Sequence, residues 1–171
     1  MDAATEPAGL PLTIRPFRPE DLDPLYFLER RCHSETFRLP FQQLLETLLD
    51  PRVSALVAEV SDREERPLVG ALVVQGMAGE PRLTLLTLMV DAPFRRAGIA
   101  TRLLELAVRL AQAAGIAELA TPLEADNAAG RAFLQAAGFA PAGEWAPYFP
   151  DGEAGRLWVC AVPAPEAEAP A

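Results

Sequence analysis

The sequence predicts one α/β domain of the α+β kind, in which a mixed, mostly antiparallel sheet of about seven strands carries helices on both faces. Short β-rich runs alternate with segments of helical periodicity along most of the chain. Three β-rich runs follow one another between residues 52 and 90, as in an antiparallel meander. A long amphipathic helix then precedes the next strand, which is the arrangement of a crossover between parallel neighbours.

The first part of the chain predicts a strand and two helices. Residues 12–17 alternate apolar and polar side chains, as a half-buried strand does. A helix is predicted over 21–33, because acidic residues fill its first turn and leucines recur on one face. A second helix, over 41–49, must end at Asp50, since the residue before Pro51 is disfavoured in helical geometry.

The middle of the chain predicts the meander and the crossover helix. Residues 52–60 and 67–77 are β-rich runs with a polar loop between them. Residues 83–90 are almost continuously apolar, which predicts a central strand covered on both faces. The helix over 98–114 has an apolar stripe and ends at Gly115, a frequent residue just beyond a helix.

The last part of the chain predicts a strand over 116–123, a helix over 127–137 and two more strands from Phe139 onward. The segment 150–152, Pro-Asp-Gly, separates these two strands as a turn. The predicted order is therefore β-α-α-β-β-β-α-β-α-β-β.

Composition predicts a cytoplasmic protein with one domain over 10–162. Half of the residues are apolar, enough to build a core. No apolar run reaches the roughly 18 to 20 residues of a membrane span, and the first residues do not resemble a signal peptide. The segment 163–171 is rich in Pro, Ala and Glu, which predicts a disordered acidic tail.

Charge and cysteine content exclude several classes of function. The net charge is −9, and all 15 basic residues are arginines. We therefore expect no nucleic-acid partner and no anionic membrane partner, whereas a cationic amine would be attracted, although solubility alone also accounts for the charge. Cys32 and Cys160 lie far apart, without a CxxC motif or a histidine cluster, so we predict neither a metal site nor a disulfide.

A seven-residue segment between the strand over 83–90 and the following helix predicts a phosphate-binding loop. It consists of Arg95, Arg96, Ala97, Gly98, Ile99, Ala100 and Thr101. The first turn of a helix has unpaired backbone N–H groups at its positive end, and small residues there let phosphate oxygens approach the backbone. The two arginines add positive charge and the threonine a hydroxyl. These features suit a diphosphate, and the alternative is an ordinary helix start beside surface arginines.

Other phosphate-binding loops fit the sequence poorly. The GxxxxGK[ST] pattern requires a lysine, and the chain contains none. The dinucleotide fingerprint GxGxxG is also absent. A kinase, an NTPase and a Rossmann dehydrogenase are therefore disfavoured.

Two motifs resemble the GNAT acetyltransferase superfamily. The segment LMVDAPFRRAGIATRLLELA is similar to motif A of that superfamily, which has the pattern (Arg/Gln)-x-x-Gly-x-(Gly/Ala) after a strand. The pattern Asn127-x-x-Gly130-x-x-Phe133-Leu134-x-x-x-Gly138-Phe139 is similar to its following helix and Gly-Phe turn. With the element order, the resemblance covers about residues 12–161. It implies an acetyl-CoA-dependent N-acetyltransferase in which a primary amine, either a protein N-terminus or a small amine, attacks directly in a ternary complex.

The resemblance also implies the residues that bind the cofactor. The backbone of Leu88, Met89 and Val90 would pair with the pantetheine arm, and the loop 95–101 would hold the pyrophosphate. Asn127 would orient the pantetheine end. This agrees with the residues, because a strand that parts from its neighbour exposes N–H and C=O groups that an amide-rich pantetheine can satisfy. Many members of the superfamily are dimers, which leaves a homodimer open.

The acid and base of the reaction are not at the positions where similar proteins have them. Segments near residues 27–45 and 148–153 look like the bacterial ribosomal-protein Nα-acetyltransferase branch, yet Leu134 replaces the usual tyrosine and Pro122 the usual glutamate. We expect Tyr148 as the proton donor and Glu124 or Glu59 as the base. The alternatives are that Tyr148 is a packed ring and that the two glutamates are solvated or capping carboxylates.

Two other readings of the whole chain stay open. Leu134 and Pro122 are compatible with a GNAT-like module that binds acyl-CoA without turnover. A fold without any coenzyme A site would follow if the 95–101 loop bound no ligand.

Overall fold

The computed structural model of the chain describes residues 9–35, 38–145 and 155–166, and it confirms the predicted fold class and element order. Its elements are β1 (Leu12–Pro16), the 3-10 turn η1 (Pro19–Asp21), α1 (Leu22–Cys32), α2 (Phe41–Leu49), β2 (Val53–Val60), β3 (Leu68–Gln75), β4 (Arg82–Val90), the 3-10 turn η3 (Ala92–Phe94), α3 (Ile99–Ala114), β5 (Glu118–Leu123), α4 (Ala128–Ala136), β6 (Ala140–Trp145) and β7 (Gly155–Ala161).

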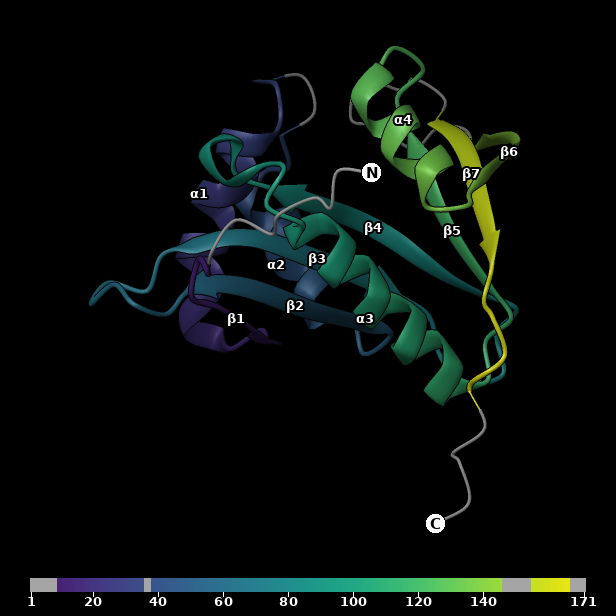
Figure 1. The fold of residues 1–171 in the computed structure, drawn as a ribbon, viewed down its shortest axis with the longest axis horizontal. Coiled ribbons are helices and arrows are strands. Elements are labelled where there is room, and N and C mark those ends of the chain that lie inside the picture. The colour runs from purple at the N-terminus through teal and green to yellow at the C-terminus, as the bar shows by residue number, and fades with distance from the viewer. Residues whose placement is uncertain (1–8, 36–37, 146–154, 167–171) are drawn as a thin grey trace, which may run out of the picture.

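The strands form one seven-stranded sheet in the order β1-β2-β3-β4-β5-β7-β6. Strands β2, β3 and β4 pair antiparallel as the predicted meander, β1 adds to it antiparallel beside β2, and β4 pairs parallel with β5. Helix α3 lies on one face of the meander and α1 and α2 on the other (Figure 1). Both faces of the central strands are therefore covered, as the sequence predicts.

Strands β4 and β5 stay together for only part of their length. They pair from Arg82 and Glu118 to Thr84 and Ala120, and no pair follows beyond that point. Strand β5 remains paired with β7 as far as Leu123. The two strands therefore diverge like the arms of a V (Figure 1). Pro122, which has no N–H to donate, lies on β5 beyond the last pair.

A β-bulge in β4 reverses which of its side chains point toward α3 and which point toward α1 and α2. The register shifts so that Val73 of β3 pairs with Thr87 while Val74 pairs with Leu85. Before the bulge Leu85 packs under α3, and after it Leu88 joins the same cluster, while Met89 packs against α1. Because side chains alternate along a strand, one extra residue reverses the alternation. The almost continuous apolar run of β4 therefore has two causes, the covered faces that the sequence predicts and the bulge that it does not.

Close packing fixes the start of α3 against the sheet. Gly70 of β3 lies beneath Ile99, and a Cβ at Gly70 would be 3.1 Å from Cγ2 of Ile99. Ile99 itself is only 2% exposed. The small residue on β3 therefore lets the first turn of α3 approach the sheet closely, which sets the position of the loop before it.

The helices in the described ranges are too short or too polar to cross a membrane. Within the same ranges, no group of three or more His, Cys, Asp or Glu side chains is arranged to hold a metal ion. Cys32 and Cys160 are free thiols.

Candidate active-site cleft

A cavity of about 470 Å³ fills the space between the diverging strands. Its wall comes from β4, from the end of β5 and from the first turns of α4, together with the end of α1. At the point where the ladder stops, the hydroxyl of Thr121 donates a hydrogen bond to the carbonyl of Leu85 at 3.1 Å. The split is thus closed at its apex by a side chain, and beyond the apex the edge of β4 faces the cavity.

The loop before α3 combines left-handed backbone with open space. Arg96 and Gly98 have φ angles of 64° and 74°. Nothing lies within 4 Å of the position that a Cβ at Gly98 would occupy. Left-handed residues interspersed in a turn direct successive N–H groups toward a common point, which is a recurrent way to bind an anion. The sequence did not predict the positive φ of Arg96, because only glycine signals that conformation reliably.

Side-chain contacts hold this loop to its surroundings. Nε of Arg95 donates to the carbonyl of Val90 at 3.0 Å. Asp91 accepts from the backbone N–H of Ala92 at 3.0 Å and forms an ion pair with Arg31 of α1 at 3.0 Å. The loop is therefore fixed both to the end of β4 and to the helix on the opposite face of the sheet.

The structure gathers the predicted cofactor residues along one path. Six of them line the cavity: Leu88, Met89, Val90, Arg95, Ala100 and Asn127. The other five belong to the loop and the first turn of α3 and are not part of the cavity wall: Arg96, Ala97, Gly98, Ile99 and Thr101. Because Ile99 is buried in the core, only its backbone is available to a ligand.

Asn127 is the N-cap of α4, and both ends of its amide are engaged. Its Oδ1 accepts from the N–H of Gly130 at 2.8 Å, and its Nδ2 donates to Oε2 of Glu124 at 3.1 Å. A Cβ at Gly130 would lie 2.8 Å from Cδ1 of Leu123 and 2.9 Å from Cγ of Asn127. A side chain at position 130 would therefore push against Leu123 and the capping amide of Asn127.

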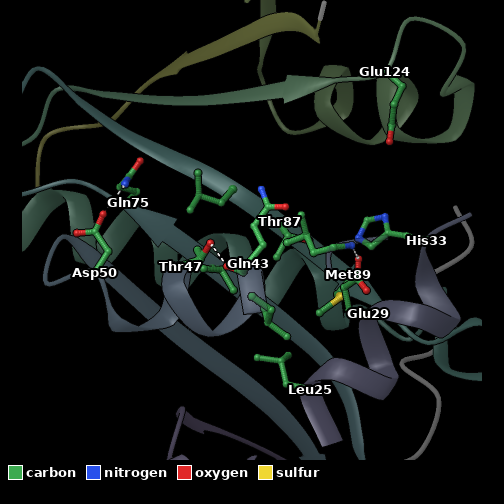
Figure 2. Close-up of a pocket in the computed structure, with 14 residues that line it drawn as sticks. Leu25, Glu29, His33, Gln43, Thr47, Asp50, Gln75, Thr87, Met89 and Glu124 are labelled. Carbon is green, nitrogen blue, oxygen red and sulfur yellow. Dashed lines mark hydrogen bonds between the residues drawn. The ribbon is translucent and has the colours of Figure 1, made fainter. Parts of the chain in front are cut away.

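A second cavity, of about 320 Å³, lies between α1, α2 and the strands β3 and β4 (Figure 2). Five residues line both cavities: His33, Leu86, Thr87, Met89 and Glu124. The two cavities consequently meet beside the diverging part of β4. A group held in the first cavity and a group held in the second could come into contact there.

The structure brings one of the three predicted catalytic residues to this meeting point. Glu124 lines both cavities. Glu59 lines neither of them; it is 4% exposed and is held by Arg15 at 2.8 Å and Arg66 at 3.7 Å. Tyr148 lies outside the described residues. The apolar Leu134 belongs to the wall of the first cavity.

Arg15 joins Glu59 to a second carboxylate. It donates to both oxygens of Asp21, at 2.6 and 2.8 Å. The hydrogen bonds from Arg15 hold the pKa of Asp21 below its usual range, so Asp21 stays ionised at neutral pH. This network joins β1, η1 and β2, and it gives the buried Glu59 a structural partner.

Sequence reasoning did not single out Glu29 and Thr87, which both line the second cavity. Glu29 is 3% exposed; its Oε1 accepts from the N–H of Leu39 at 2.9 Å. Its Oε2 and the hydroxyl of Thr87 are buried without a hydrogen-bond partner in the described ranges. The one signal in the sequence that could have identified Glu29 is its place directly after Leu28, on the face of α1 that is buried.

Cys32 lines the first cavity near this junction. Burial, and then the negative charge of Asp91, raise the pKa of its thiol above the usual range. Cys32 is therefore a neutral thiol at physiological pH and a weak nucleophile.

Comparison with known proteins places the chain in a family. The sequence model of the acetyltransferase (GNAT) family matches residues 20–139, more than half of the chain. A sequence search of curated proteins gave no significant match.

Solved structures share the fold at low identity. The ribosomal-protein-S18-alanine N-acetyltransferase from Escherichia coli is 23% identical with a TM-score of 0.74, over 92% of this chain and 97% of that one. The PaiA N-acetyltransferase from Thermoplasma acidophilum, solved with coenzyme A, is 18% identical with a TM-score of 0.70, over 88% and 98%. The GNAT-like decarboxylase GphF, solved with isobutyryl-CoA, is 24% identical with a TM-score of 0.71, over 88% and 100%.

Proposed function

Because the chain belongs to the acetyltransferase (GNAT) family, we propose that it is an enzyme that transfers an acetyl group from acetyl-CoA to a primary amine. The observation that carries this proposal is the split between β4 and β5, which opens a cavity of about 470 Å³ beside the loop 95–101. The neighbouring cavity that meets it supports a second substrate in direct contact with the first.

The cofactor side of the site follows from the path of the predicted residues. The backbone of Leu88, Met89 and Val90 would pair with the pantetheine arm, since β5 does not pair with this part of β4. The loop 95–101 and the N-terminus of α3 would bind the pyrophosphate, with the arginines supplying charge. Asn127 would contact the pantetheine end from α4.

Acetyl-CoA supplies an activated acetyl group as a thioester. We propose that Glu124 takes a proton from the acceptor ammonium, directly or through one water, because it lies where the two cavities meet. The neutral amine nitrogen then bonds to the carbonyl carbon, and the carbon–sulfur bond breaks. The departing thiolate takes a proton from Tyr148 or from water. The nitrogen, which still carries one proton more than an amide has, gives that proton to the deprotonated donor. Glu59 is less well placed as a base, since Arg15 and Arg66 engage its carboxylate.

Proteins of similar fold favour an amine acceptor. One of them acts on the alanine of ribosomal protein S18, as its name states. Another is named as an N-acetyltransferase and was solved with coenzyme A. These names support a protein N-terminus or a small amine as the acceptor.

A second candidate is a module that binds acyl-CoA without transfer. Leu134 and Pro122 favour it, because both line the cavity and neither can move a proton. The GNAT-like decarboxylase named above is a case in which a similar fold is named for a reaction other than transfer.

A turnover assay tests the proposal. The purified chain would be supplied with acetyl-CoA and a panel of amines: a peptide with N-terminal alanine, an aliphatic diamine, an amino acid and an aminoglycoside. We expect release of the free thiol together with an acetylated product by mass spectrometry. Glu124→Gln should lower kcat roughly 100-fold with acetyl-CoA binding retained, since general-base catalysis contributes about that factor.

The matched control is Glu59→Gln, which makes the same change in the Arg15 network. We expect Glu59→Gln to lower the thermal midpoint, whereas its loss of kcat should stay far below that of Glu124→Gln. Retained acetyl-CoA binding with no product from any amine would contradict the transferase and support the binding module.

A further inference from the structure

The cavity of about 320 Å³ between α1, α2, β3 and β4 has carboxylates at both ends (Figure 2). Asp50 lies at one end, and Glu29 and Glu124 lie at the other, near His33. Its lining, taken from the described part of the chain, includes no arginine. Between the ends the wall has leucine and valine side chains together with the uncharged polar side chains of Gln43, Thr47 and Thr87 (Figure 2). Such a lining suits an occupant with a hydrocarbon body and a cation at each end.

Glu29 gives independent evidence for a ligand at the end of the pocket near His33, here called the inner end, as opposed to the outer end at Asp50. It is 3% exposed, and its Oε2 is buried without a hydrogen-bond partner in the described ranges. An unpaired buried carboxylate oxygen is costly unless a donor reaches it. Thr87, which lines both cavities, has an unpartnered buried hydroxyl. An amine placed at this end can supply an N–H donor to Glu29.

Asp50 can accept a further donor at the outer end. Its Oδ1 accepts from the N–H of Arg52 at 2.8 Å, and its Oδ2 accepts from Nε2 of Gln75 at 3.1 Å. An ionised carboxylate has about four lone-pair sites, so two such bonds leave capacity for an ammonium group. The same two bonds fix the direction of the carboxylate.

We propose that the acceptor is an aliphatic diamine or polyamine that spans this pocket. One amine lies at the inner end, beside Glu29 and Glu124, where the pocket meets the cofactor cavity. The second ammonium is bound by Asp50, and the alkyl chain lies along the uncharged wall between them. This inference rests on the proposed acetyl transfer and names its substrate class.

The test compares two acceptors that differ by one charge, cadaverine and n-pentylamine, at saturating acetyl-CoA. We expect kcat/KM to be about tenfold higher for cadaverine, as a hydrogen bond to a charged group would give. Asp50→Asn should remove most of this preference, because it should lower kcat/KM for cadaverine far more than for n-pentylamine. Glu29→Gln should lower kcat/KM for both amines, because it acts on the end that they share.

Glu46→Gln is the matched control, since Glu46 is an exposed carboxylate on α2 that does not line the pocket. It should leave both amines unchanged. The proposal is overturned if cadaverine and n-pentylamine react equally, if Asp50→Asn lowers both alike, or if a peptide with N-terminal alanine reacts faster than cadaverine.

Calorimetric titration of cadaverine into the complex with free CoA separates this inference from the proposed transfer. Binding that Asp50→Asn weakens about tenfold would sustain the diamine site even if no acceptor were acetylated. Absence of cadaverine binding would overturn the diamine site even if a peptide were acetylated.

Discussion

Asn127 joins the stability of α4 to the chemistry of the cleft. Its Oδ1 caps the helix and its Nδ2 donates to Glu124, while the residue itself lines the cavity between β4 and β5. The sequence predicted a helix from Asn127, and the structure makes this residue the N-cap, for which asparagine is favoured. It did not predict the bond to Glu124, which depends on how the end of β5 turns into α4.

Two substitutions at Asn127 separate these two bonds. Asn127→Ala removes both, so we expect it to lower the free energy of unfolding by about 1 kcal/mol and to lower kcat. Asn127→Ser keeps a good cap but is too short to reach Glu124. It should retain most of the stability, measured by urea unfolding, and lose as much kcat as the alanine variant. Full kcat in Asn127→Ser would show that the bond to Glu124 has no part in turnover.

Helix α3 has a left-handed glycine at each end, and the one at its start belongs to the loop 95–101. Gly98 and Gly115 have φ angles of 74° and 68°, and a Cβ at either would meet nothing within 4 Å. The sequence predicted the end of the helix from Gly115, and it predicted the start at Gly98, one residue before Ile99, where α3 begins. The bulge in β4 and the positive φ of Arg96 could not be predicted, since they arise from non-local packing and carry no residue-type signal.

The paired substitutions Gly98→Ala and Gly115→Ala distinguish backbone strain from ligand binding. Each places an alanine in left-handed conformation with open space around it, so each should cost about 1 kcal/mol of stability. Only Gly98→Ala should also weaken coenzyme A binding, measured by calorimetry, because Gly98 lies in the 95–101 loop. Equal coenzyme A affinity in the two variants would argue against a pyrophosphate site at the loop.

At the scale of the whole molecule, the site arises where a regular sheet stops being regular. Pairing between β4 and β5 ends after Thr84 and Ala120, and the two cavities meet beside the strand that is left. The sequence predicted the element order from its local periodicity, and the resemblance of the two motifs implied the parting of the strands. The second cavity and the buried Glu29 could not be predicted, because they depend on how α1 and α2 pack on the sheet.

The thermal midpoint with and without acetyl-CoA or free CoA tests the central claim that the split between β4 and β5 and the loop 95–101 form a coenzyme A site. A ligand that binds only the folded state stabilises it by about 2.7 kcal/mol at a hundredfold excess over Kd, which is a rise of several degrees. We predict this rise for the wild type and for Arg109→Glu, which makes the same charge change at an exposed position of α3. The rise should be lost in Arg96→Glu. No rise at millimolar ligand, or an equal rise in Arg96→Glu, would contradict the assignment.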